Sequence, residues 1–148
     1  MNGYILDTDC FSLWQRNHLS VVEHINVNKE ITSTTIVTAE ELIRGRFHII
    51  RQASQSSQPD RLVSAYTRLW NTLEDFKILY ILNFDNRSYA IYTDLRRQKI
   101  RIGTQDLRIA SIALAHNSIL VTRNRRDFAK VPDLALEDWT IQAGSNNP

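Results

Sequence analysis

Short apolar runs alternate with longer helical patterns along the 148 residues of the chain. The short runs are rich in β-branched and aliphatic residues, as buried strands usually are. Strands that alternate with helices predict an α/β fold with a central, mostly parallel sheet. We expect these strands at residues 4–6, 30–35, 79–84 and 118–122, with a last short strand within 134–139.

Helical patterns fill the intervals between these runs. Thr38 and Glu41 have the spacing of a capping box, so we expect a helix to begin at Thr38. The polar stretch 53–59 follows this helix, and Asp60 can cap the next one, which predicts a helical hairpin. Apolar residues recur along the second arm as one stripe, which is typical of core or of a dimer surface. The stripe consists of Leu62, Tyr66, Leu69, Leu73 and Phe76. We expect the other helices near residues 13–14, around 21–25, and over 85–98 and 105–117.

The composition fits one soluble domain over residues 1–148. Of the residues, 43% are hydrophobic and 23% charged, and no apolar run approaches the roughly 18 residues of a membrane span. The single Cys excludes a disulfide scaffold and a thiolate metal cluster. The N-terminal segment lacks the pattern of an export signal, so we expect a cytoplasmic protein without a membrane partner.

The charge is nearly balanced, at +2, and by itself predicts no nucleic-acid partner. The kind of base is more informative than the total, because 14 of the 18 basic residues are Arg. The planar guanidinium suits phosphate oxygens and stacks on bases. This favours a phosphate-bearing or RNA partner.

Oxygen-bearing side chains recur where ligands bind in open α/β sheets, beyond the carboxyl ends of the strands. We expect five of them to meet at one edge without His or Cys in ligand spacing, which favours Mg²⁺ or Mn²⁺. Without a cation, such carboxylates raise one another's pKa. The candidates are Asp7 after the first strand, Glu41 and Asp106 in first helical turns, and Asn124 and Asp127 after the fourth strand.

Three of these residues also have a structural explanation. Asp106 shares a predicted helix face with Ile109, Ala110 and Ala113, opposite Arg108 and Ser111, but a first-turn acid also stabilises a helix dipole. The capping box explains Glu41, and a turn or cap explains Asp7. Gly45, in the middle of a helix, predicts that something approaches that face closely.

Taken together and in order, the motifs resemble those of PIN-domain nucleases, and most closely VapC-type toxins. The matching pieces are Y-I-L-D-T-D, T-A-E-E-L-I-R-G, D-L-R-I-A-S-I-A-L-A and L-V-T-R-N-R-R-D-F, with L-A-L-E-D-W similar to the last strand of the family. The resemblance implies a compact α/β/α sandwich and an endoribonuclease that depends on Mg²⁺ or Mn²⁺. It also implies a homodimer that a small antitoxin protein silences by reaching into the acidic pocket.

The resemblance carries roles to individual residues. Asp7, Glu41 and Asp106 match the acids of the family motifs, and Asp7 and Asp106 would anchor the metal ion. The fullest family pattern has Asp where this chain has Asn124, although many VapC-like chains pair Asn there with an acid three residues later, here Asp127. Asp9 stands where the family commonly has Asn or Ser, and this extra acid would either support the site from behind the metal ligands or cap the next helix. The nearby Arg123, Arg125 and Arg126 would hold the RNA backbone.

Two other functions fit parts of the sequence. Asp7-Thr8-Asp9 imitates the nucleophile and acid of haloacid-dehalogenase-like phosphatases, but none of the four Lys residues stands convincingly at a strand end. The uncharged Asn124 would suit a non-catalytic RNA-binding or scaffold protein, although three acids are retained. The RNA target and the number of metal ions are not predicted.

Overall fold

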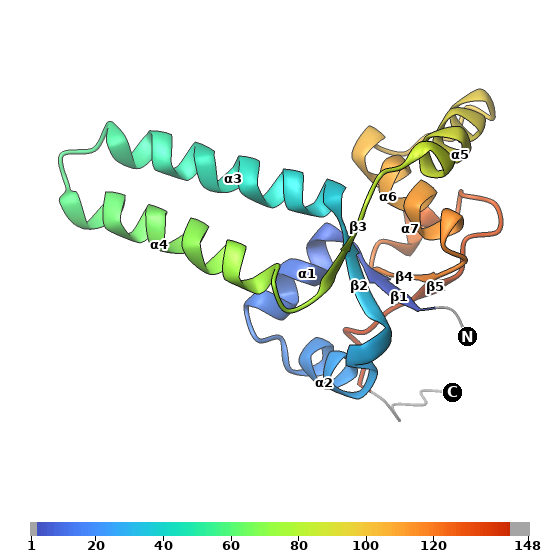
Figure 1. Ribbon diagram of the computed structural model, residues 1–148, viewed down its shortest axis with the longest axis horizontal. Coiled ribbons are helices and arrows are strands. Elements are labelled where there is room, and N and C mark those ends of the chain that lie inside the picture. The colour runs from blue at the N-terminus through green and yellow to red at the C-terminus, as the bar shows by residue number, and fades with distance from the viewer. Residues whose placement is uncertain (1–2, 143–148) are drawn as a thin grey trace.

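A five-stranded sheet organises the computed structural model, which describes residues 3–142 (Figure 1). Residues 1–2, where the segment inspected for an export signal begins, lie outside this range. The strand order is β3-β2-β1-β4-β5 and every pairing is parallel, which confirms the predicted sheet. The strands are β1 (Tyr4–Leu6), β2 (Thr32–Thr35), β3 (Tyr80–Leu82), β4 (Ile119–Val121) and β5 (Leu136–Glu137).

Helices cover both faces of the sheet. Neighbouring strand residues point to opposite faces, so Ile5 and Leu120 pack with α5 and α6, whereas Leu6 and Val121 pack with α1 and α2. The predicted α/β/α sandwich is therefore confirmed. The helices are α1 (Thr8–Gln15), α2 (Leu19–Asn28), α3 (Ile36–Ser54), α4 (Pro59–Asp75), α5 (Asn86–Arg97), α6 (Thr104–Ala115) and α7 (Arg125–Phe128), and a 3₁₀ turn covers Lys29–Ile31. Within residues 3–142, no helix is both long and apolar enough to cross a membrane.

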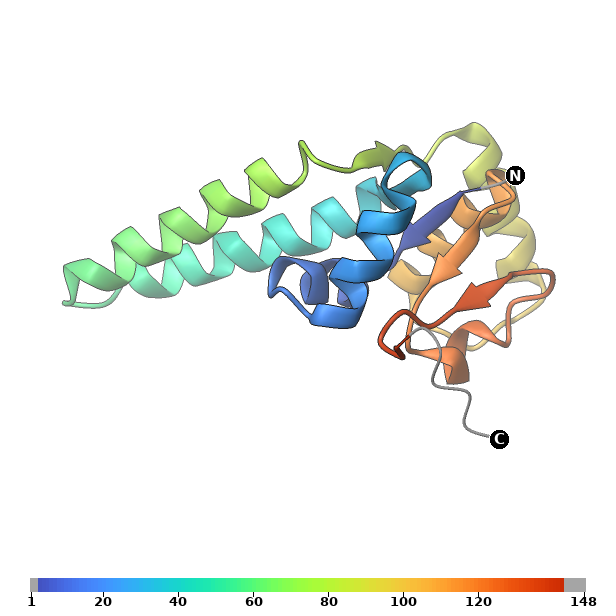
Figure 2. The same cartoon turned by 90° about the horizontal axis from the view of Figure 1, so that it is seen from below.

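The predicted helical hairpin is present. Helices α3 and α4 pack along each other and project from the sheet as one arm (Figures 1 and 2). The predicted single stripe on α4 is wrong in part, because α4 packs on α3 through the smaller Ala65 and Thr72, which are buried. Phe76 joins the core, but Tyr66 and Leu73 are exposed. They form an outward stripe with the exposed Val63 and Trp70.

Helix α3 begins earlier than the capping box predicts. Its N-cap is Thr35, whose extended backbone ends β2 and whose Oγ1 accepts a hydrogen bond from the Thr38 amide at 3.1 Å. Thr38 is therefore fully buried inside the first turn, and the predicted capping box is wrong. The consequence for function is that Glu41 is not used to cap the helix.

Three smaller expectations also differ from the structure. Helix α4 begins at Pro59, which is favoured in a first turn, so Asp60 lies inside the turn and does not cap it. Ser111 does not face solvent, because α6 is buried on most sides and the Ser111 hydroxyl donates to the Leu107 carbonyl at 2.7 Å. No other part of the described chain approaches a side chain added at Gly45 within 4 Å.

Candidate active site

The candidate site lies where the strand order reverses, beside β1 and β4. Asp7 follows β1 directly, and its amide donates to the carbonyl of Val121 at the end of β4, at 3.1 Å. Its Oδ1 accepts a hydrogen bond from the Cys10 amide at 2.8 Å and so caps α1. Only 5% of Asp7 is exposed. The start of α1 thus fixes this carboxylate at the carboxyl edge of the sheet, as the topology predicts.

An open pocket of about 670 Å³ gathers residues from four separate segments of the chain. Three of the predicted acids, one predicted amide and the predicted Arg123 line it, together with Asp9, which the sequence analysis noted as an additional acid, and Thr8, which it missed. The lining residues are Asp7, Thr8, Asp9, Glu41, Asp106, Arg123, Asn124 and Phe128.

Hydroxyl groups position Glu41. Thr8 Oγ1 donates a hydrogen bond to Glu41 Oε1 at 2.7 Å and lies 3.0 Å from Thr38 Oγ1. Thr8 and Thr38 were not predicted as site residues. Their signal in the sequence is positional: Thr8 directly follows Asp7, and Thr38 lies three residues before Glu41, one helical turn away.

The pocket carries an excess of negative charge, because within residues 3–142 no Lys or Arg forms an ion pair with Asp7, Glu41 or Asp106. Burial raises the pKa of Asp106 to about 6, and the negative charges of Asp7, Glu41 and Asp127 add to the effect. Burial also raises the pKa of Asp7, against the hydrogen bonds that favour its charged form. The mutual increase of carboxylate pKa values expected from the sequence is thus present at Asp106.

Asn124 and Asp127, the two candidates after β4, occupy different positions relative to the pocket. Asn124 lines the pocket and caps α7, since its Oδ1 accepts from the Asp127 amide at 3.4 Å and its Nδ2 donates to Asp127 Oδ2 at 3.1 Å. Asp127 does not line the pocket, and Lys130 Nζ lies 3.6 Å from its other oxygen. The hydrogen bond from Asn124 lowers the pKa of Asp127. Asp127 therefore contributes charge at a distance and holds Asn124 in place.

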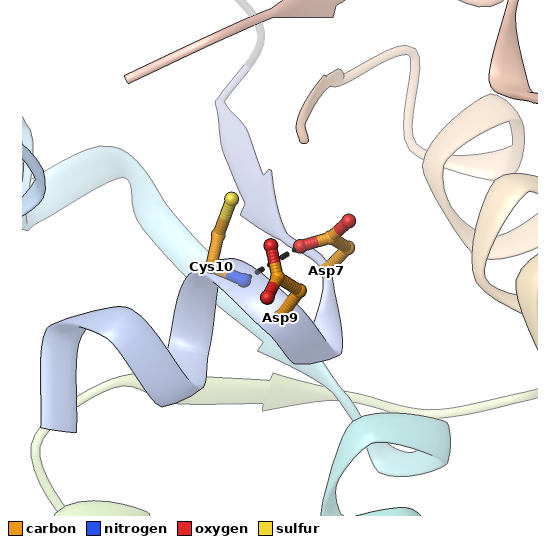
Figure 3. A group of neighbouring side chains, drawn as sticks. All are labelled: Asp7, Asp9 and Cys10. Atoms are coloured by element: carbon orange, nitrogen blue, oxygen red, sulfur yellow. Dashed lines mark hydrogen bonds between the residues drawn. The ribbon is translucent and has the colours of Figure 1, made fainter. Parts of the chain in front are cut away.

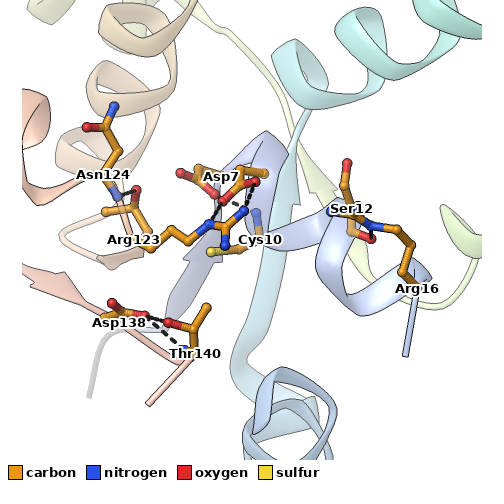
Figure 4. Close-up of polar contacts among 10 residues, drawn as sticks. Asp7, Cys10, Ser12, Arg16, Arg123, Asn124, Asp138 and Thr140 are labelled. Carbon is orange, nitrogen blue, oxygen red and sulfur yellow. Dashed lines mark hydrogen bonds and ion pairs between the residues drawn. The ribbon is translucent and has the colours of Figure 1, made fainter. Parts of the chain in front are cut away.

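Arg123 closes one side of the pocket through an ion pair with Asp9. The Arg123 Nε and one terminal nitrogen donate to the two Asp9 oxygens at 2.6 and 2.9 Å. Figure 4 shows Arg123 beside Asp7. Arg125 and Arg126 are exposed and do not line the pocket. Asp9 is thus engaged in fixing Arg123 rather than in capping α1, where Asp7 is the cap.

Cys10 lies close to two of these acids but does not extend the donor set. Ligand atoms of Asp7, Asp9 and Cys10 lie within 4.8 Å of one another at the start of α1 (Figure 3). Burial and the neighbouring carboxylates raise the pKa of the Cys10 thiol, so it remains protonated. Cys10 packs in the core, as a small buried hydrophobe does.

The family model for the PIN domain matches residues 4–134. The chain belongs to the PIN domain family. No Lys lines the acidic pocket among residues 3–142, so the phosphatase interpretation of Asp7-Thr8-Asp9 has no support in this PIN domain.

Two curated relatives match this PIN domain over nearly its whole length, and a third matches part of it. A tRNA(fMet)-specific endonuclease VapC of Salmonella typhimurium is 28% identical over 145 residues, covering 94% of this chain and 99% of the relative. The protein of the same name from Shigella flexneri is 29% identical and covers 95% and 100%. Ribonuclease VapC2 of Rickettsia felis is 40% identical over 65 residues, covering 41% and 48%.

Solved structures of similar fold come from toxin–antitoxin complexes. VapBC-1 of nontypeable Haemophilus influenzae superposes with a TM-score of 0.72 at 25% identity, covering 93% of this chain and 98% of that one. VapBC2 of Rickettsia felis, bound to a promoter DNA fragment, gives a TM-score of 0.69 at 26% identity, covering 92% and 98%. The resemblance to VapC toxins expected from the motifs is therefore confirmed.

Proposed function

We propose that this PIN domain is an endoribonuclease that hydrolyses RNA phosphodiester bonds with Mg²⁺ or Mn²⁺ and acts as the toxin of a toxin–antitoxin pair. The observation that carries the proposal is the acidic pocket at the carboxyl edge of the sheet, in which Asp7, Glu41 and Asp106 form no ion pair with a base of residues 3–142. The names of the full-length VapC relatives support ribonuclease activity.

The donor set fits a hard divalent cation. The acids of the pocket offer only carboxylate oxygens, the ligands that Mg²⁺ and Mn²⁺ prefer. Burial, with the neighbouring negative charges, raises the pKa of Asp106, and a bound cation would stabilise its charged form. We infer that Asp7 and Asp106 hold the ion and that Glu41 and Asn124 complete its surroundings. When bound, such an ion makes water more acidic and stabilises charge that develops on the phosphate.

The protein side chains then have distinct tasks. The Cys10 amide fixes the Asp7 carboxylate, so this ligand is positioned before substrate arrives. Thr8 occupies one oxygen of Glu41, which leaves the other free to accept a proton from the attacking water. Arg123, held by Asp9, contacts the phosphate beside the pocket, while Arg125 and Arg126 lie further out and hold the flanking backbone.

An antitoxin is the protein partner that we propose. The similar solved structures are VapBC complexes, which supports a cognate antitoxin for this chain. The homodimer stays a prediction, and the exposed stripe of Val63, Tyr66, Trp70 and Leu73 on α4 is an apolar surface that it can bury.

Cleavage of purified RNA tests the proposal. In Mn²⁺, the wild-type chain is expected to cut RNA, and Asp7→Asn and Asp106→Asn are expected to abolish cutting while their circular dichroism spectra remain those of a folded chain. Transfer RNA belongs among the substrates, because two relatives are named for it.

Asp133→Asn is the matched control, because Asp133 is exposed, lies outside the pocket and has a backbone φ of 65° that Asn tolerates well. Cleavage at the wild-type rate by both pocket variants would overturn the assignment. RNA binding without cleavage by the wild type would favour the scaffold alternative.

A further inference from the structure

A second cleft lies between α1 and the helical hairpin, on the side of Asp9 away from the acidic pocket. It has a volume of about 490 Å³, and three arginines line it: Arg16 of α1, Arg46 of α3 and Arg68 of α4. None of the residues predicted to hold RNA belongs to this cleft. Its chemistry is therefore separate from that of Arg123, Arg125 and Arg126.

The described chain offsets the positive charge of this cleft only in part. Two acids also line it: Asp9 is paired with Arg123, whereas Asp75, whose Oδ2 accepts from Gln15 Nε2 at 3.1 Å, favours the charged form of Arg46 through its own charge. Within residues 3–142, no carboxylate forms an ion pair with any of the three arginines. The three arginines therefore leave an excess of positive charge that an anion from outside the chain can offset.

The side chain of Arg46 is held in position within the cleft. It is half-buried, and its Nε donates to the buried Thr72 Oγ1 at 3.0 Å across the hairpin. The pKa of Arg46 is lowered by burial and then by the like charge of Arg68. The two guanidiniums therefore lie close enough to repel each other, and an anion between them would relieve that repulsion.

The cleft is continuous with the acidic pocket on one side and with the hairpin on the other. Asp9 lines both the acidic pocket and the cleft. Arg68 lines both the cleft and the next groove along the hairpin, which Arg61 also lines. A strand leaving the acidic pocket past Asp9 would thus meet Arg46, Arg68 and Arg61 along the hairpin. This hairpin projects from the sheet as an arm (Figures 1 and 2).

We propose that this cleft binds backbone phosphates of the RNA strand on one side of the scissile bond, with Arg46 and Arg68 sharing one phosphate and Arg16 flanking it. The inference rests on the proposed ribonuclease function. Continuity with the acidic pocket favours a polynucleotide, and the guanidinium fork matches phosphate oxygens. The helical hairpin then acts as a binding arm for substrate and not only as a support for the sheet.

The test measures binding of a fluorescent 20-nucleotide single-stranded RNA by anisotropy over a range of salt concentrations. All proteins carry Asp106→Asn so that the RNA stays intact. Relative to this background, Arg46→Gln with Arg68→Gln is expected to weaken binding about tenfold and to reduce the slope of log affinity against log salt by about 1. Arg97→Gln, an exposed arginine on α5, is the matched control and should change neither quantity.

Arg68→Gln alone keeps the test valid if the double variant fails to fold. The Arg68 side chain is exposed and has no hydrogen-bond or ion-pair partner within residues 3–142, whereas Arg46 donates to Thr72. Arg68→Gln alone should also lower the affinity for RNA, but by a smaller factor than the double variant does. Unchanged affinity and salt slope in a folded double variant would overturn the inference.

Cleavage kinetics separate this inference from the proposed function. With Asp106 restored, the double variant should raise KM for the 20-nucleotide RNA and leave kcat unchanged. Absence of cleavage by the wild type would overturn the proposed function while the binding result still decides the role of the cleft. Cleavage by the wild type with an unchanged KM in the double variant would overturn the role of the cleft alone.

Discussion

At the scale of single residues, hydroxyl groups decide how the acids of the pocket are presented. Thr8 donates to Glu41, and Thr8 is in turn in contact with Thr38, which is fully buried in the first turn of α3. Because Thr8 belongs to α1 and Glu41 to α3, this contact ties the element after β1 to the element after β2. Glu41 therefore has a fixed orientation before any cation or RNA binds.

Replacing the Thr8 hydroxyl tests this positioning role. Thr8→Val keeps the shape and removes the donor at 2.7 Å from Glu41 Oε1. A hydrogen bond to a charged group contributes about 1.5–3 kcal/mol, so we expect kcat for RNA cleavage to fall about tenfold or more. The same change at Thr93, whose hydroxyl bonds only the Tyr89 carbonyl on α5, should leave kcat unaltered.

A kcat for Thr8→Val equal to that of the wild type would contradict the positioning role.

Sequence reasoning identified the acids of the pocket but not the contacts between them. Asp7 could be selected because it follows a strand and Asp106 because it opens a helix, which is local information. Glu41 was selected as a first-turn acid, but α3 begins at Ile36, so Glu41 lies beyond the first turn. The pairing of Asp9 with Arg123 spans 114 residues, and no local pattern predicts it. The capping box failed for a related reason: the buried contacts of Thr38 and the cap by Thr35 overrode a motif that is favourable only when no better cap precedes it.

At the scale of elements, hydrophobic periodicity predicts which segments are helices or strands, but not which face of a helix is buried. The order of strands and helices matches the prediction because each run is local. On α4 the buried contacts are Ala65 and Thr72, which fit closely against α3, and larger residues point outwards. A stripe read from hydrophobicity alone cannot distinguish such a packing face from a surface that awaits a partner.

Two glycines give opposite predictions for stability. A Cβ at Gly3 would lie 2.5 Å from the carbonyl oxygen of Ile31, so Gly3→Ala should destabilise the fold by about 1–3 kcal/mol. At Gly45 the space is open, so Gly45→Ala should stabilise α3 by about 1 kcal/mol. Urea unfolding of the two variants measures both effects, and a destabilising Gly45→Ala would show that another part of the chain contacts this face.

At the scale of the whole molecule, the net charge of +2 is unevenly distributed, with acidic residues in the pocket and basic residues around it. The acids converge at the carboxyl edge of the sheet, whereas arginines line the neighbouring cleft and the hairpin. The arginines would attract RNA, which is a polyanion, towards the acidic pocket. The carboxylates of that pocket would repel the RNA unless a cation is bound. We therefore expect the proposed binding of RNA and of metal to be coupled through charge.

The same acidic pocket makes the metal-free fold sensitive to pH. The pKa of Asp106 in the folded chain, about 6, lies above its ordinary value of 3.8, so the folded state binds this proton more tightly than the unfolded state does. The stabilisation from that proton is complete below about pH 4 and is lost as the pH rises through 6. A divalent cation should replace the proton above that range and should bind weakly below it.

The melting temperature, measured with and without Mn²⁺ at pH 7.5 and pH 5, tests the acidic metal site most directly. At pH 7.5, saturating Mn²⁺ should raise the melting temperature of the wild type by about 5–10 °C, and at pH 5 the rise should be small. Asp106→Asn should melt above the metal-free wild type at pH 7.5 and should show no rise with Mn²⁺. An equal rise in both proteins, or no rise in either, would contradict a divalent cation held by Asp7 and Asp106.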